Sequence, residues 1–148
     1  MLDSSRNAPP SRRTPPAVLL VEPEPMLRLT VSKFLGHSGC RVTACADGGA
    51  GAAVLMDGGL RPALIMLEAR VLDADLAEVA HRLRELAPAA QMLGIADVVA
   101  HGGPMPASLP RGLRFLAPPF DFADVLRAVQ SSLRHAGFRL PDAEMLEA

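Results

Sequence analysis

The sequence predicts an α/β fold, a doubly wound five-stranded parallel sheet of the flavodoxin-like type with strand order 2-1-3-4-5. Short apolar segments alternate along the chain with segments whose apolar residues recur at helical spacing. Two of the apolar segments, 17–21 and 64–67, contain no polar residue. Continuous apolar runs of this length are typical of strands that are buried on both faces of a parallel sheet.

The expected helices begin and end at residues that start or stop helices. Pro25 suits the first turn of a helix, Gly39 and Pro88 end helices, and Asp121 caps the last one. A turn is expected at 47–49. The expected strands cover 17–21, 40–45, 64–68, 90–96 and 113–117, and the helices cover 25–38, 50–56, 75–86 and the stretch from Asp121 to about 136.

The stretch 97–112 breaks this alternation, because it contains three prolines and three glycines. Proline removes a helical hydrogen bond and clashes with the preceding turn. We therefore expect the fourth helix to be shortened or replaced by a Pro/Gly-rich loop. Residues 1–16 are polar and proline-rich, which predicts a disordered N-terminal tail, followed by one domain at 17–137 and a C-terminal tail at 138–148.

The composition argues against several classes of function. The formal net charge is -1 and the charges are scattered, unlike the basic stripe of a protein that binds nucleic acid. No apolar segment has membrane-spanning length and no apolar signal core is visible, so we expect a cytoplasmic protein with no membrane partner. Cys40 and Cys45 lie five positions apart in one expected strand and should face opposite sides as reduced thiols.

Acidic side chains follow two of the expected strands. Glu68 ends the third strand, and Glu22 and Glu24 come directly after the first. In open α/β sheets, ligands bind beyond the carboxyl ends of the strands, so these residues predict an acidic pocket there. Three carboxylates could bind Mg²⁺ weakly. A solvated acidic rim is the simpler interpretation, and we expect no bound metal or other cofactor.

Four motifs, in this order and spacing, are similar to those of one known family. They lie at 19–25, 39–48, 64–68 and 115–121. Together they resemble the receiver domain of bacterial response regulators over roughly residues 17–136. The resemblance implies a site in which acidic residues hold magnesium and an aspartate ending the third strand accepts a phosphoryl group from a histidine kinase. A threonine or serine and a lysine then contact that group.

This chain departs from the family pattern at several of those positions. Glu68 stands where the phosphoaccepting aspartate is expected. Three further positions are degenerate, because Pro23 replaces an acidic residue, Ile95 replaces the hydroxyl and Pro118 replaces the lysine. Phosphoryl transfer depends mostly on positioning and electrostatic stabilisation. We therefore expect that the chain does not take up phosphate by the family mechanism and is not an enzyme.

Two family features are kept. Phe115 stands at the aromatic position on the fifth strand that moves during switching in the family. Pro119 stands at the following proline, and the resemblance implies a cis bond before it, which is accessible for proline.

The sequence therefore predicts an atypical, stand-alone pseudo-receiver that acts through phosphorylation-independent protein–protein interaction. Its partner would be a histidine kinase, another regulator or a second copy of itself. The surface of the last helix, with Arg114, Arg127 and Arg134, is the expected contact.

Two alternatives remain open at this point. The first is a phosphorylatable single-domain response regulator in a phosphorelay, with Glu24 or Glu68 as an unusual acceptor. The second is a small flavodoxin-like nucleotide or cofactor binder that uses the same crevice at the strand ends, although the sequence lacks a phosphate-cradling loop.

Overall fold

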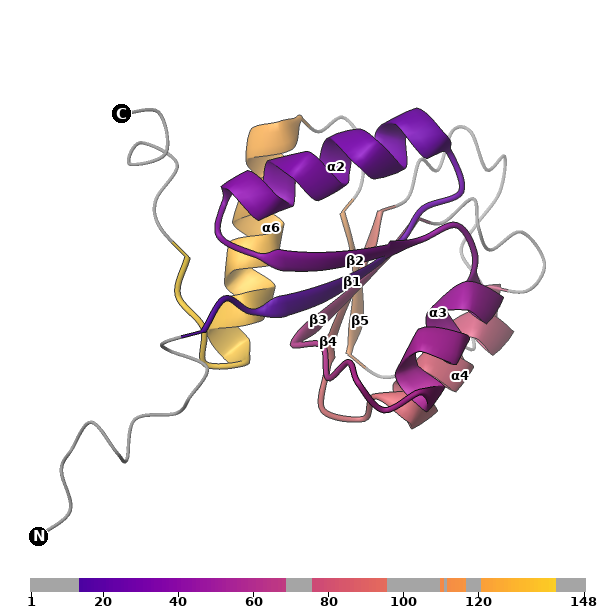
Figure 1. The fold of residues 1–148 in the computed structure, drawn as a ribbon. Helices are drawn as coiled ribbons and strands as arrows, with labels where there is room; N and C mark the ends of the chain where they lie inside the picture. Colours follow the sequence, from indigo (N-terminus) through magenta and orange to yellow (C-terminus); the bar gives the residue numbers. More distant parts are fainter. Residues whose placement is uncertain (1–13, 69–75, 96–109, 111, 117–120, 141–148) are drawn as a thin grey trace, which may run out of the picture.

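The computed structural model describes residues 14–68, 76–95, 110, 112–116 and 121–140 (Figure 1). Its five strands form one parallel sheet in the order β2-β1-β3-β4-β5, which confirms the predicted topology. In chain order the elements are β1 (Ala17–Val21), α2 (Pro25–His37), β2 (Arg41–Cys45), α3 (Gly48–Met56), β3 (Leu64–Glu68), α4 (Leu76–Leu86), β4 (Gln91–Ile95), β5 (Leu113–Leu116) and α6 (Phe122–His135).

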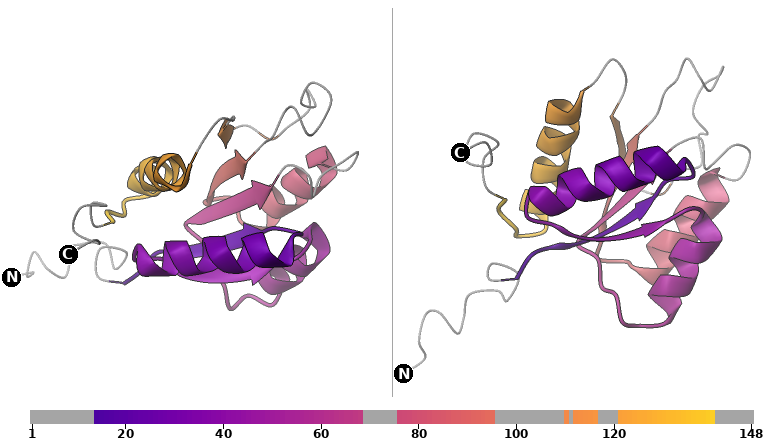
Figure 2. Two further views of the ribbon diagram at one scale, coloured as in Figure 1. Left: turned by 90° about the horizontal axis from the view of Figure 1, so that it is seen from above. Right: turned by 45° about the horizontal axis from the view of Figure 1, so that its top comes forward.

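The helices cover the two faces of the sheet in pairs. Helices α2 and α6 lie on one face, and α3 and α4 lie on the other (Figure 2). Because neighbouring side chains of a strand point to opposite faces, Leu20 and Met66 pack under α2 and α6, whereas Leu19 and Ile65 pack under α3 and α4. Every residue of β1 and β3 is buried, which explains the apolar runs at 17–21 and 64–67.

The chain between β2 and β3 differs from the sequence prediction at one point. Residues 47–49 were expected to form a turn, but Asp47 is the N-cap of α3, and the helix begins at Gly48. The Asp47 carboxylate accepts a hydrogen bond of 2.8 Å from the Ala50 amide. A Cβ atom on Gly48 would lie 2.6 Å from Cγ1 of Val79, so a glycine here lets α3 lie close to α4.

The two cysteines lie on opposite sides of the sheet, as their spacing predicted. Cys40 belongs to the cluster under α2 and α6, and Cys45 belongs to the cluster under α3 and α4. Both thiols are free and buried. Burial raises the pKa of the Cys40 thiol to about 11, so this thiol stays protonated at neutral pH.

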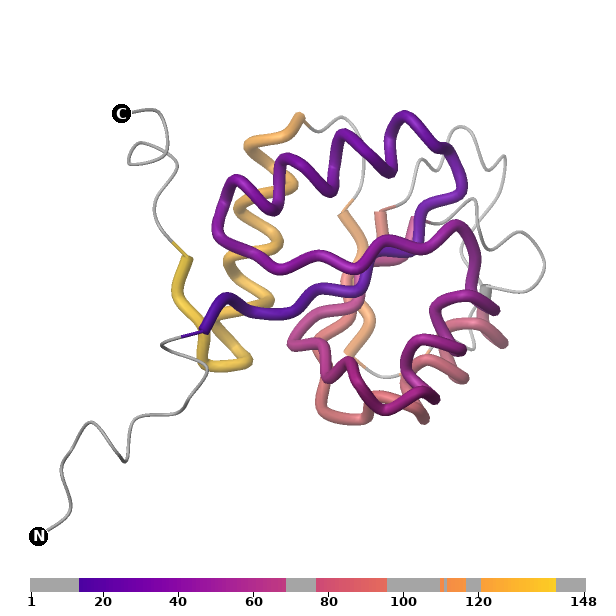
Figure 3. Tube along the Cα trace, viewed as in Figure 1, coloured from indigo at the N-terminus to yellow at the C-terminus, as the bar shows by residue number. Residues whose placement is uncertain are grey.

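The chain after α6 turns back toward the start of β1 (Figure 3). Gly137 takes a positive φ of 90° at this bend, and Leu140 is buried in the cluster that also contains Val18. The segment expected to begin the C-terminal tail therefore contributes apolar contacts as far as Leu140, and Phe138 packs against the same cluster.

Several expectations fall outside the described residues. They concern the N-terminal tail as far as residue 13, most of the Pro/Gly-rich stretch 97–112, Pro118, Pro119 and the last eight residues. Within the described ranges, no helix is both long and apolar enough to cross a membrane.

Helix α6 begins with a reciprocal cap. The Asp121 carboxylate accepts a hydrogen bond from the Asp124 amide, and the Asp124 carboxylate accepts one from the Asp121 amide, each 2.9 Å long. The bond from the Asp121 amide holds the pKa of the Asp124 carboxyl below its ordinary value, and Arg127 adds to the effect. This cap sets the position of Phe122, whose ring contacts Phe34 of α2 at a centroid distance of 5.0 Å.

Replacing Asp121 with alanine should lower the free energy of unfolding by about 1 kcal/mol, because the Asp124 amide loses its partner at the helix start. Urea denaturation of the full chain measures this loss. The matched variant Asp121→Asn keeps an oxygen acceptor and should lose only a few tenths of that amount. Equal losses in the two variants would contradict the capping role.

Candidate functional site

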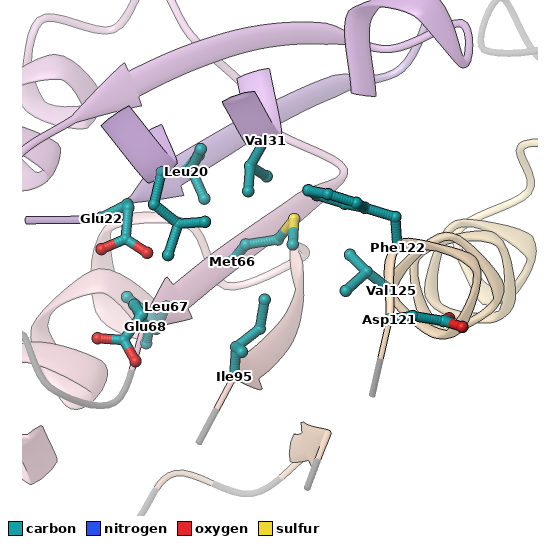
Figure 4. Close-up of a pocket in the computed structure, with 11 residues that line it drawn as sticks. Leu20, Glu22, Val31, Met66, Leu67, Glu68, Ile95, Asp121, Phe122 and Val125 are labelled. Atoms are coloured by element: carbon teal, nitrogen blue, oxygen red, sulfur yellow. The ribbon is translucent and has the colours of Figure 1, made fainter. Parts of the chain in front are cut away.

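Two buried carboxyl groups lie at the edge of the sheet where the strands have their carboxyl ends. Glu22 directly follows β1 and Glu68 ends β3, and the two strands pair in register up to Val21 and Leu67. Both glutamates continue the alternation that faces α2 and α6, and they are only 2% and 5% exposed. Figure 4 shows them on the same side of one pocket, so the structure brings these two predicted site residues together.

Glu22 is held by bonds from both sides of the turn into α2. Its amide donates to the carbonyl of Cys45 on β2 over 2.9 Å, and its carbonyl accepts a bond of 3.0 Å from the Arg28 guanidinium. Its side-chain oxygen Oε2 accepts a bond of 3.1 Å from the Glu24 amide. The position of this carboxyl group therefore depends on the β1–α2 turn as well as on the strand.

Glu24 lies outside the pocket that Glu22 and Glu68 line. Its side chain caps α2, with Oε1 accepting from the Met26 amide over 3.2 Å and Oε2 accepting from the Leu27 amide over 2.6 Å. Both oxygens of this exposed residue thus face the positive end of the helix. An acidic residue is favourable at the start of this helix, but the sequence did not predict the side-chain cap, because glutamate is not among the residues preferred at this position.

Of the three acidic side chains expected at this edge, those of Glu22 and Glu68 line the pocket and that of Glu24 does not. Magnesium requires several oxygen ligands in nearly octahedral geometry. Pro23 offers no side-chain oxygen, and both carboxylate oxygens of Glu24 accept hydrogen bonds from the start of α2. Within the described part of the chain, no group of three or more acidic, histidine or cysteine side chains is arranged to hold a metal ion.

The residue beside Glu68 on the next strand is apolar. Ile95 pairs with Glu68 in the β3–β4 ladder and packs against the core cluster under α2 and α6. Its side chain lines the pocket and has no group that can donate a hydrogen bond to an anion. Pro118, at the position of the family lysine, and Pro119, the cis-proline candidate, lie outside the described residues.

Phe115 lies against a glycine on the neighbouring strand. Phe115 and Gly94 are partners in the β4–β5 ladder, and Phe115 packs toward α3 and α4. A Cβ atom on Gly94 would lie 2.3 Å from the ring carbon Cε1 of Phe115. The glycine therefore makes the space that this ring occupies. A glycine inside an apolar strand is the sequence signal that could have identified this contact.

A cavity of about 350 Å³ lies between α2, α6 and the ends of the central strands (Figure 4). Glu22 and Glu68 form its polar side, and most of the remaining lining is apolar. The sequence predicted an acidic pocket at this edge but not its apolar lining, because that lining depends on the separation between two helices and the sheet. The lining residues are Leu20, Glu22, Leu27, Val31, Met66, Leu67, Glu68, Ile95, Asp121, Phe122 and Val125.

Replacing Gly94 with alanine should lower the free energy of unfolding by about 1–3 kcal/mol, because the new methyl group would overlap the Phe115 ring. Urea denaturation of Gly94→Ala, Phe115→Leu and the double variant forms a double-mutant cycle. The combined loss should be smaller than the sum of the single losses, since the shorter side chain leaves room for the methyl group. Simple additivity would contradict the contact.

Millimolar MgCl₂ should not raise the midpoint of thermal unfolding above the value in NaCl of equal ionic strength. A cation bound only by the folded chain would raise it, but the donor set at the strand ends is incomplete. Calorimetric melting of the native chain and of Glu68→Gln measures the difference. A magnesium-specific rise that disappears in Glu68→Gln would contradict this expectation.

Comparison of the sequence with known proteins gives one weak similarity. No protein-family model matches the chain. The probable transcriptional regulatory protein TcrX of Mycobacterium tuberculosis is 26% identical over 129 residues, which are 87% of this chain and 54% of that protein. The chain thus spans about half the length of this curated relative.

Solved structures give a stronger similarity in fold. A response regulator receiver protein from Sinorhizobium medicae has a TM-score of 0.63 at 24% identity, over 82% of this chain and 97% of that one. The receiver domain of the hybrid histidine kinase CckA has a TM-score of 0.64 at 20% identity, over 79% and 98%. A protein named adenylate cyclase, from Rhodopirellula baltica, has a TM-score of 0.65 at 21% identity, over 82% and 90%. The chain therefore has the fold of response regulator receiver domains, as its sequence motifs predicted.

Proposed function

We propose that this chain is an atypical receiver domain of two-component signalling that acts by binding another protein independently of phosphorylation. The observation that carries the proposal is the set of side chains at the carboxyl edge of the sheet. There the receiver fold presents Glu68 beside the apolar Ile95, while Glu24 caps a helix. The likeness in fold to receiver domains supports the signalling class.

The geometry of the acceptor position argues against phosphoryl transfer to Glu68. Glutamate is longer than aspartate by one methylene group, a displacement on the order of 1 Å, and a misplacement of that size can cost roughly a hundredfold in rate. The transferred group also needs positive charge and hydrogen-bond donors around it. Ile95 supplies neither. The single lysine of the chain, Lys33, lies on α2 and not after β5.

Binding to a partner requires only a surface of defined shape and charge. In the described part of the chain, α6 exposes Arg127 and Arg134, and β5 exposes Arg114. The Arg127 guanidinium is paired with Asp124 of the same helix. We propose a protein partner for this surface, either a histidine kinase, another regulator or a second copy of the chain.

A phosphorelay regulator with an unusual acceptor is the second candidate. It is favoured by the presence of two buried carboxyl groups, on Glu22 and Glu68, at the edge where the receiver fold carries its acceptor. This candidate requires a covalent acyl phosphate on the chain, whereas the pseudo-receiver proposal forbids one.

Incubation with acetyl phosphate and Mg²⁺, followed by intact mass measurement, separates the two candidates. We expect no gain of about 80 Da, the mass of one phosphoryl group, on the native chain. The variant Glu68→Asp should also remain unmodified, because shortening the side chain restores the reach but not the missing lysine and hydroxyl.

A receiver domain with the complete set of acidic, hydroxyl and lysine residues serves as the positive control in the same reaction. A stoichiometric adduct on Glu68 or Glu24 of the native chain would overturn the pseudo-receiver proposal in favour of the phosphorelay. An adduct on Glu68→Asp alone would show that the length of the side chain is the decisive defect.

A further inference from the structure

We propose that β2 forms an antiparallel pair with β2 of a second copy of this chain, so that two five-stranded sheets join edge to edge. A two-fold axis between the two Ala44 residues relates the copies. The inference goes beyond the proposed signalling role and does not depend on it. It uses the edge of the sheet opposite to β5 and Arg114, so the surface proposed above for a protein partner stays free.

Strand β2 is an edge strand with hydrogen-bonding groups on its outer side. In the part of the chain that the structure describes, it pairs with β1 alone. Its Arg41 amide and its Cys45 carbonyl both bond toward the β1 side, over 2.9 Å each. Because the backbone groups of successive residues in a strand point to opposite sides, those of Val42 and Ala44 point away from β1. A further extended chain can bind at these positions, since an added strand gains main-chain hydrogen bonds.

The space beside this edge is open in the described structure. Figure 1 looks onto β2, with α2 above it and α3 below, and neither helix crosses in front of the strand. Along α2, the row of side chains nearest β2 runs from Arg28 to Ser32 and Gly36, and a Cβ atom on Gly36 would meet nothing outside its own helix within 4 Å. The exposed residues in the first turns of α3 are small, namely Gly49, Ala50 and Ala53. A second copy can therefore approach the edge without displacing a helix.

The sequence of β2 does not protect the strand from pairing. Edge strands are commonly protected by a charge, a proline or a bulge. Between the first and the last residue of β2 there is none of these, because Val42, Thr43 and Ala44 are uncharged and the register with β1 is continuous. The β5 edge is shorter, with four residues against five, and Arg114 stands exposed within it. Of the two edges, β2 is therefore better suited to pairing with another strand.

The outward-pointing residues determine which pairings are possible. In an antiparallel pair, such residues stand opposite each other and exchange hydrogen bonds. Ala44 can therefore stand opposite Ala44 of the second copy, or opposite its Val42. The first register also places Arg41 of each copy opposite Asp47 of the other, whereas the second register places Arg41 opposite Cys45.

Charge favours the first register. Asp47 has an extended backbone, with φ -152° and ψ 172°, so the alternation of the strand places it on the same face as Arg41 and Cys45. Its Oδ1 accepts the bond from the Ala50 amide, and a carboxylate has a second oxygen for another donor. Residues directly opposite each other have Cβ atoms about 4.5–5.5 Å apart, within reach of an Arg–Asp ion pair. The two-fold axis forms this pair twice, so the edge is complementary to a second copy of itself.

Sedimentation equilibrium of the full chain, from micromolar to millimolar concentration, measures the association, and amide hydrogen exchange locates it. We expect a monomer–dimer equilibrium. Exchange of the Val42 and Ala44 amides should slow as the concentration rises, because these amides gain partners in the dimer. The Arg41 amide already bonds toward the β1 side and serves as the internal reference, since its exchange should not depend on concentration.

Three variants test the edge and the register. Arg41→Glu places like charges opposite each other twice and should weaken the dimer roughly tenfold or more. Arg114→Glu, the same change at an exposed residue of the opposite edge, is the matched control and should leave the dimer unchanged. Ala44→Pro removes an outward-pointing donor at the centre of the interface and should abolish the dimer. Proline is tolerated where the amide of an edge strand faces solvent, so this variant should still fold.

A chain that stays monomeric over this range overturns the proposal, and so does exchange of the Val42 and Ala44 amides that is independent of concentration. A dimer that Arg114→Glu weakens and Arg41→Glu does not would place the contact at the β5 edge and would also overturn it. The measurements on the native chain decide the matter even if a variant fails to fold. The mass measurement with acetyl phosphate tests the signalling proposal separately, so the two proposals can fail independently.

Discussion

The pairing of two fully buried strands, β1 and β3, is the constraint on which the rest of this structure depends. Their parallel register brings Val21 beside Leu67, so the next residue of each strand reaches the same edge of the sheet on the same face. That residue is a glutamate in both cases. Because the alternation of side chains is strict, Glu22 and Glu68 must face the layer of α2 and α6. The candidate site is thus a direct consequence of strand register.

The two faces of the sheet are packed in different ways. Under α3 and α4, glycines at 48 and 94 allow a neighbouring helix residue and the Phe115 ring to approach the backbone closely. Under α2 and α6, a cavity remains beside the strand ends. The acidic pair, Glu22 and Glu68, therefore lies at one side of a largely apolar cavity.

The receiver fold and the receiver chemistry make different demands on the sequence. The fold needs apolar strands, helices of suitable length and caps at their ends, all of which are present. The chemistry needs charged and hydroxyl groups at a few strand ends. At the described positions Ile95 and Glu24 do not supply them, because one side chain is apolar and the other is bonded to a helix start. Both side chains serve the fold instead, since Ile95 packs against the core cluster under α2 and α6 and Glu24 caps α2.

The sequence by itself determined the strand order, the buried central strands, the opposite orientation of the two cysteines and the position of the acidic pair along the chain. These follow from local periodicity and from residues that start or stop helices, which act over a few positions. The sequence did not predict that α3 begins at Gly48 or that the Glu24 side chain caps α2. At the start of a helix several backbone amides compete as partners for one carboxylate. Only the tertiary structure decided the contact of Phe115 with Gly94 and the apolar lining of the pocket beside Glu22 and Glu68. Both depend on distances between strands and helices that are far apart in sequence, and these distances are set by the packing of all the layers together.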